Sequence, residues 1–212
     1  MTDLHNARKY DDLWPLVDGA DCLLVAGDVA NRYLGTYLRG IAFLNEAAQR
    51  LPTFFSLGNH EIKSKNAEKI MLALAQSKAT VLVNQYTAFH GIWIGGWYPP
   101  HLLKTVGNMD KTENMMDVFE ALDGCKVLMC HRPHDYMNYL RERKLDLVIA
   151  GHAHGGQIRI KGQGLYSPGQ GLLPKYTKGV VDHRMIVCAG SGDAVRLPRW
   201  GNPREVLRIT LD

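Results

Sequence analysis

Two histidines lie one residue apart in the glycine-rich stretch Gly151-His152-Ala153-His154-Gly155-Gly156, directly after an apolar run that ends at Ala150. Histidine is the commonest metal-ligating side chain, and glycines allow the positive φ angles and close approaches that converging ligands require. The pattern therefore indicates a metal site at the end of a buried strand. A glycine-rich turn with two incidental histidines is the alternative interpretation.

Three more apolar runs end in residues with oxygen or imidazole donors: 23–27 before Asp28, 54–58 before Asn59 and His60, and 127–130 before His131. In open α/β sheets, sites form at the C-terminal ends of strands because loops converge there. One such residue is more often a helix cap or a turn former. Four strand ends of this kind together favour a shared site.

Asp3 and His5 add a carboxylate and an imidazole near the start of the sequence. The candidate ligands are then Asp3, His5, Asp28, Asn59, His131, His152 and His154. This mixed nitrogen and oxygen set, with no thiolate, is larger than one tetrahedral zinc ion needs. It suits two divalent ions that share a carboxylate, about 3.5–4 Å apart, as in phosphoryl transfer to water. The donors favour manganese, iron or zinc over copper.

Short apolar runs alternate with helical patterns over the first 150 residues, which predicts βα units around a central sheet. The expected strands are 21–27, 53–58, 81–83, 88–93, 126–130 and 145–150, and the expected helices are 33–50, 66–77, 113–122 and 136–143. The last part of the chain reads as largely antiparallel strands at 157–160, 180–182, 184–189 and 206–211. With neither a repeat nor a linker, residues 1–212 are predicted to form a single domain.

The composition is that of a globular protein, with 46% hydrophobic and 22% charged residues. The sequence shows no membrane span and no signal peptide pattern. Its net charge of +4 is spread along the chain, so we expect anionic substrates and no specific nucleic-acid binding. The four cysteines lack CxxC spacing and are predicted to be reduced thiols, which favours a reducing compartment.

The order D-x-H, GD, GNH[ED], an apolar run ending in His, and GHxH resembles the calcineurin-like metallophosphoesterase superfamily, and all five blocks are present in order. Residues 3–6, 151–157, 173–176 and 202–205 resemble its bacterial YaeI/YkuE-type branch. The resemblance implies an α/β fold, a four-layer α-β-β-α sandwich of two mixed sheets. It also implies hydrolysis of a phosphodiester, phosphomonoester or pyrophosphate bond by a hydroxide that two metal ions activate.

The resemblance implies a role for each candidate. Asp3, His5 and His154 hold the first metal ion, Asn59, His131 and His152 hold the second, and Asp28 bridges them. His60 protonates the leaving alkoxide or neutralises phosphoryl oxygens, with an orienting role as the alternative. Glu61 is expected to orient a neighbour or to cap the following helix. Arg132 and His134 are read as loop residues, although either could contact substrate.

The substrate implied is a phosphate-ester small molecule or a lipid-linked compound, selected by the connections 95–112 and 162–179. A binding or scaffold protein with the same fold and an impaired site is the alternative function. The discriminating observation is metal-dependent turnover.

In the superfamily a first strand precedes the D-x-H block, whereas only Met1 and Thr2 precede Asp3 here. We therefore expect a truncated chain, or a partner strand in that slot. We also expect Asp3 and His5 to be loosely held and the first metal ion to bind more weakly. The chain as given is predicted to be cytoplasmic, and membrane-associated or exported if an anchor or signal precedes it.

Overall fold

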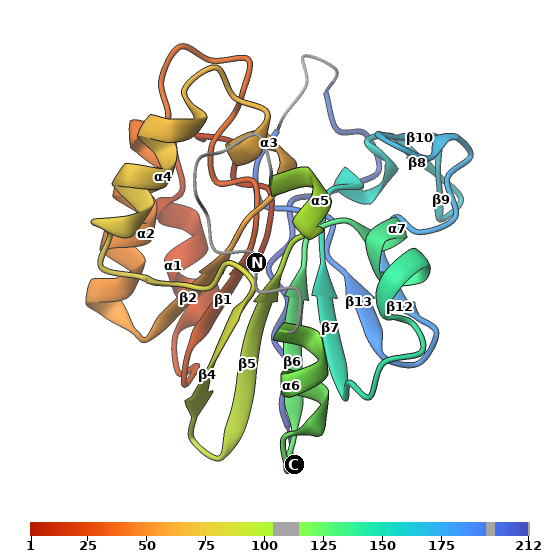
Figure 1. Cartoon of the computed structure of the whole chain (residues 1–212). Helices are drawn as coiled ribbons and strands as arrows, with labels where there is room; N and C mark the ends of the chain where they lie inside the picture. The colour runs from red at the N-terminus through yellow and green to blue at the C-terminus, as the bar shows by residue number, and fades with distance from the viewer. Residues whose placement is uncertain (104–114, 194–197, 212) are drawn as a thin grey trace.

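The computed structural model describes residues 1–103, 115–193 and 198–211. They form two β-sheets packed face to face, with helices on both outer sides (Figure 1). The inner layer joins Ala26 and Phe54 of one sheet to Ile94, Val127 and Ile149 of the other. The predicted four-layer α/β architecture is confirmed.

The first sheet is parallel, in the order β1 (Leu23–Ala26), β2 (Thr53–Ser56) and β3 (Thr80–Val81). Parallel neighbours need crossover connections, which α2 (Leu38–Arg50) and α4 (Ala67–Ala75) provide. The turn η1 (Asp11–Leu13) and α1 (Trp14–Val17) precede β1, and α3 (Asn59–Ile62) follows β2.

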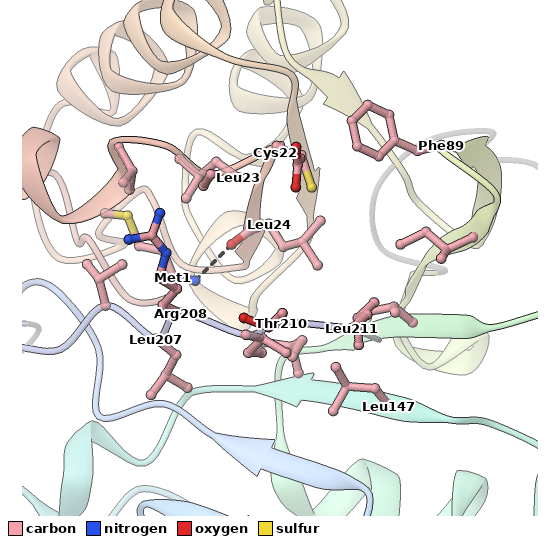
Figure 2. Close-up of a pocket in the computed structure, with 18 of the residues that line it drawn as sticks. Met1, Cys22, Leu23, Leu24, Phe89, Leu147, Leu207, Arg208, Thr210 and Leu211 are labelled. Carbon is pink, nitrogen blue, oxygen red and sulfur yellow. Dashed lines mark hydrogen bonds between the residues drawn. The ribbon is translucent and has the colours of Figure 1, made fainter.

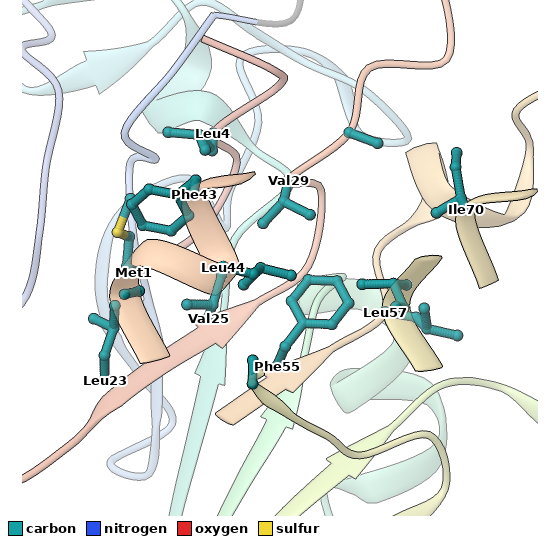
Figure 3. Close-up of a cluster of buried hydrophobic side chains, with 14 of the residues drawn as sticks. Met1, Leu4, Leu23, Val25, Val29, Phe43, Leu44, Phe55, Leu57 and Ile70 are labelled. Atoms are coloured by element: carbon teal, nitrogen blue, oxygen red, sulfur yellow. The ribbon is translucent and has the colours of Figure 1, made fainter. Parts of the chain in front are cut away.

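Helix α2 buries one face against the first sheet. Phe43 and Leu44 of α2 pack near Val25 of β1 and Phe55 of β2 (Figure 3). The predicted helical start at residue 33 is wrong, because Asn31 Oδ1 accepts a hydrogen bond from the Tyr33 amide at 3.0 Å and forms a local turn. Residues 33–37 therefore form a loop between Asp28 at the end of β1 and the start of α2.

The second sheet is mixed, in the order β12-β13-β7-β6-β5-β4. Its strands are β4 (Gln85–Phe89), β5 (Ile92–Trp97), β6 (Lys126–Cys130), β7 (Leu147–Ala150), β12 (Gly179–Val181) and β13 (Met185–Val187). The four central strands, β5, β6, β7 and β13, pair in parallel, and the edge strands β4 and β12 pair in antiparallel orientation. Its outer face packs against α6 (Met115–Ala121) and the π-helical turn η2 (Tyr136–Leu140), which follows α7 (Pro133–Asp135).

The prediction of one strand at 88–93 is wrong. β4 and β5 form a hairpin whose turn is His90 and Gly91. Both turn residues have positive φ, 46° and 84°, as a two-residue turn matched to strand twist requires. Gly91 therefore marks a reversal of the chain direction.

The remaining elements lie near the carboxyl ends of the parallel strands. They are α5 (Pro100–Leu103), η3 (His154–Gly156), the pair β8 (Arg159–Ile160) and β9 (Gln163–Gly164), and the pair β10 (Tyr166–Ser167) and β11 (Gly171–Leu172). Both pairs are antiparallel, as predicted for this part of the chain. Of the predicted helix 113–122, residues 113 and 114 lie outside the described residues, and so do residues 104–112 of the connection 95–112.

Residues 1–3 run alongside β1. The Met1 nitrogen donates to Leu24 O at 2.8 Å, the Ala26 amide donates to Met1 O at 2.9 Å, and the Asp3 amide donates to Gly27 O at 3.1 Å. These bonds bury Asp3 and His5 almost completely, at 0% and 2% exposed. The expectation that the two residues are loosely held does not fit this arrangement, and a weaker first ion stays a prediction.

The predicted strand 206–211 is wrong. Residues 206–211 line a cavity of about 460 Å³ together with Met1, Leu24 and Leu147 (Figure 2). Among the described residues, the 206–211 segment pairs with no strand. The cavity also includes Cys22 and Leu23 at the start of β1, whereas the candidate ligand Asp28 follows its end. Within the described residues, no helix is long and apolar enough to cross a membrane.

Candidate metal centre

The structure brings all seven predicted ligands and His60 to the carboxyl ends of β1, β2, β6 and β7 or beside them. None is more than 8% exposed. A buried concentration of imidazoles and carboxylates is costly unless the groups pair with each other or bind a metal ion.

Asp3, His5 and His154 form the first cluster. Asp3 Oδ1 lies 3.5 Å from His5 Nε2 and 3.5 Å from His154 Nε2, and the two nitrogens lie 3.1 Å apart. Neutral imidazoles that face each other through Nε2 share one proton. A divalent cation fits such a donor set, because neutral imidazole and carboxylate are its usual ligands.

Asp28, His131 and His152 form the second cluster. His131 Nε2 lies 3.0 Å from Asp28 Oδ2, and the His131 and His152 rings have centroids 5.2 Å apart. His131 Nδ1 donates to Ala26 O at 2.8 Å, the kind of backbone contact that orients ligating histidines. Burial opposes a charged His131, but the Asp28 carboxylate outweighs it and raises the pKa of His131 to about 10. A metal ion must displace that proton to bind.

Asp28 lies between the two clusters. The same oxygen, Oδ2, is 3.0 Å from His131 Nε2 and 3.8 Å from His5 Nε2. Asp28 has a φ of 56°, a conformation that is uncommon outside glycine. A Cβ at Gly58 would collide with Asp28 Oδ1, so glycine is needed where the β1 and β2 loops meet. One carboxylate oxygen thus faces histidines of both clusters.

Asn59 is the one predicted ligand whose donor is an amide oxygen. It begins α3 and is 6% exposed, and its Oδ1 has no hydrogen-bond partner among the described residues. Buried acceptors are normally satisfied. The next residue, His60, donates its amide to Asp28 Oδ1 at 2.7 Å, so Asn59 follows the same loop, and an unpaired amide oxygen is a donor that a cation can use.

The family model of calcineurin-like phosphoesterases matches residues 1–156, which contain every one of these side chains. This chain belongs to the calcineurin-like phosphoesterase family. Its buried aspartate and histidine clusters are consistent with the dinuclear metal site that the sequence predicts.

Similar proteins have the same general description. An uncharacterized metallophosphoesterase of Helicobacter pylori J99 is 27% identical over 193 residues, covering 88% of this chain and 48% of that protein. Phosphodiesterase YaeI of Escherichia coli K12 is 28% identical over 121 residues, covering 55% of this chain and 42% of that protein. A zebrafish (Danio rerio) transmembrane protein with a metallophosphoesterase domain is 26% identical over 152 residues, covering 65% and 34%. The chain thus spans less than half the length of these three relatives.

His60 in this phosphoesterase lies beside the first cluster. Its ring meets the His5 ring edge-on at 4.4 Å, its amide donates to Asp28 Oδ1 at 2.7 Å, and its Nδ1 accepts from the Arg32 amide at 3.1 Å. Burial lowers the pKa of His60 to about 3. The ring is therefore neutral near pH 7, with its hydrogen on Nε2.

Glu61 fastens the two ligand-bearing loops together. Its carboxylate accepts hydrogen bonds from the amides of Asp28 at 3.0 Å, Ala30 at 2.9 Å and Gly58 at 2.8 Å. Burial, and then the Asp28 charge, raise the pKa of Glu61 to about 7. Glu61 orients its neighbours, as the sequence analysis expected.

The sequence analysis read Arg132 and His134 as loop residues, but His134 lies in α7 and Arg132 directly precedes that helix. The His134 ring is 5.8 Å from the His152 ring, and a Cβ at Gly169 would lie 3.7 Å from His152 Nε2. The predicted selectivity stretch 162–179 therefore reaches the centre through the turn between β10 and β11. Arg132 Nε donates to Asp135 at 2.6 Å, so part of its guanidinium is already engaged.

The sequence analysis missed two residues that support the centre. Asn202 Nδ2 donates to His154 O at 2.6 Å and to Gln157 O at 3.1 Å. Arg199 Nη2 lies 3.4 Å from His154 Nδ1. Asn202 falls in the 202–205 segment that resembles one branch of the superfamily, but that resemblance indicates no role for Asn202. Arg199 carries no motif at all.

Proposed function

We propose that this phosphoesterase hydrolyses a phosphodiester bond with two divalent metal ions. The observation that carries the proposal is Asp28 Oδ2, which faces histidines of both clusters. A shared carboxylate is the arrangement that two ions a few ångströms apart require. The name of the Escherichia coli relative, a phosphodiesterase, supports the bond type.

In this proposal Asp3, His5 and His154 hold one ion, Asn59, His131 and His152 hold the other, and Asp28 contacts both. Such a pair supplies a hydroxide at neutral pH and neutralises the charge of the phosphoryl group. The buried residues around the clusters keep the ligands fixed before substrate arrives, so little reorganisation is needed in the transition state.

His60 acts on the substrate side of the first cluster. With Nδ1 occupied by the Arg32 amide, its Nε2 hydrogen is available to a phosphoryl oxygen or to the leaving oxygen. A hydrogen bond that strengthens as negative charge develops accelerates the reaction.

Manganese, iron and zinc fit the donor atoms. We further propose a small-molecule or lipid-linked phosphodiester as substrate and membership of the YaeI/YkuE-type branch. The similarity to phosphodiesterase YaeI over 55% of the chain supports the branch.

Hydrolysis of bis-p-nitrophenyl phosphate tests the proposal. We expect Mn²⁺ to stimulate turnover by the metal-free protein, and Asp28→Ala and His152→Ala to abolish it. His183→Ala is the control, because that exposed histidine between β12 and β13 lies outside both clusters and outside the connections 95–112 and 162–179. A folded protein without turnover in Mn²⁺, Fe²⁺ or Zn²⁺ would contradict the proposal and favour a binding or scaffold role.

A further inference from the structure

The chain segment after β13 packs directly on the backbone of Thr2 and Asp3. The Ser191 amide and its Oγ both donate to Thr2 O at 3.0 Å, and the Gly192 amide donates to Asp3 O at 2.7 Å. A Cβ at Gly190 would lie 2.8 Å from Asp3 Cβ. Residues 189–192, which we call the 189–192 turn, therefore determine where the Asp3 backbone lies.

Arg199 holds this turn at both ends. Its Nη1 donates to Ala189 O at 2.7 Å, its Nη2 donates to Gly192 O at 2.6 Å, and its Nε donates to Asp193 Oδ1 at 2.7 Å. The planar guanidinium presents its donors in a rigid fork, so one side chain fixes the separation of the two carbonyls. Only 7% of this side chain is exposed.

The same guanidinium lies behind His154. Arg199 Nη2 is 3.4 Å from His154 Nδ1, while His154 Nε2 faces Asp3 and His5 on the other side of the ring. Arg199 thus contacts one ligand of the first cluster and fixes the turn against which a second ligand packs. Among the described residues, Arg199 contacts Asp193, His154 and the carbonyls of the 189–192 turn.

We propose that Arg199 is a positioning residue for the first metal ion, setting the separation of Asp3 and His154 through the 189–192 turn. This inference rests on the proposed function, because it assumes that Asp3, His5 and His154 hold an ion. It assigns a role to a residue outside every motif of the sequence.

The direction in which metal affinity changes when Arg199 is replaced distinguishes a positioning role from an effect of charge alone. A guanidinium repels a nearby cation, so if Arg199 contributed only its charge, removing it would strengthen metal binding at the first cluster. A positioning role predicts the opposite, because Asp3 and His154 lose their fixed separation. Replacing groups that orient metal ligands typically weakens metal affinity by about 10–100-fold.

Calorimetric titration of the metal-free full chain with Mn²⁺ measures both sites. We expect two ions in the wild type. In Arg199→Ala one site weakens by at least about tenfold and the other is retained, an isotherm like that of His154→Ala and unlike that of Asn59→Ala. Arg199→Lys keeps the charge but not the fork and is expected to show the same selective loss.

Arg184→Ala is the matched control. Arg184 is half-buried and, like Arg199, donates to a backbone carbonyl, that of Arg143, at 2.9 Å. It precedes β13, whereas the 189–192 turn follows that strand. We expect Arg184→Ala to bind two ions as the wild type does.

Unchanged or tighter binding in Arg199→Ala would overturn the inference, and so would equal weakening of both sites in the folded variant. If Arg199→Ala does not fold, Arg199→Lys decides, and wild-type binding by that variant would overturn the inference. A wild-type chain that binds no Mn²⁺ would instead overturn the proposed function on which it rests.

Discussion

Two roles can be distinguished for His60: a contact with the substrate, or a place among the metal ligands. It groups with His5 and Asp28 closely enough to act as a ligand, yet its Nδ1 is occupied by the Arg32 amide. Its position allows either a hydrogen-bonding role toward substrate or a place in the metal site. The two possibilities predict different metal contents.

We predict that His60→Gln lowers kcat by about 10²–10⁴-fold, the usual range for loss of a proton-transferring or donating side chain. The metal content should remain at two ions per chain, because the seven other donors are unchanged. His183→Gln, at an exposed position between β12 and β13, should leave both quantities as in the wild type. Loss of one ion in His60→Gln would assign this histidine to the metal site instead.

The sequence predicts the candidate donors that the structure brings together, but not the residues that support them. Asp28, Asn59, His131 and His152 each follow an apolar run, so their position at a sheet edge could be deduced from the parallel-strand pattern. Arg199 acts through contacts with Ala189 and Gly192 that depend on how distant segments pack. No local pattern in the sequence reports such contacts.

At the scale of elements, the parallel strands were the most predictable and the turns the least. Runs of buried apolar residues identified β1, β2, β6 and β7, because strands buried on both faces need such runs. The β4–β5 hairpin was missed because its two strands are only half-buried in places and its turn falls inside the predicted strand 88–93. The segment 206–211 has a strand-like pattern, yet it lies along a cavity without a pairing partner.

The hairpin gives a prediction at this scale. Gly91 has a φ of 84°, and a Cβ there would meet nothing within 4 Å, so Gly91→Ala imposes backbone strain without a clash. We predict that it lowers the free energy of unfolding by about 1 kcal/mol, measured by urea denaturation of the metal-free protein.

Gly35→Ala is the control for Gly91→Ala. A Cβ at Gly35 also meets nothing within 4 Å, and Gly35 does not have a positive φ. Its effect should stay within about 0.5 kcal/mol. Equal unfolding free energies for the two variants would contradict the turn at residues 90–91.

At the scale of the whole molecule, the two sheets bring residues that are far apart in the sequence to one centre. His154 Nε2 lies 3.5 Å from Asp3 Oδ1, although the two residues are far apart in sequence. The inner layer between the sheets fixes the relative position of β1 and β2 on one side and of β6 and β7 on the other. The proposed dinuclear centre therefore depends on the packed sandwich, which explains why candidate ligands from four strand ends can share one site.

The most direct test of this account is the anomalous diffraction of a crystal of the Mn²⁺-loaded protein. We predict two manganese peaks per chain about 3.5–4 Å apart, one beside Asp3, His5 and His154 and the other beside Asn59, His131 and His152, with Asp28 between them. A single peak, or a pair of peaks that Asp28 does not join, would contradict the account.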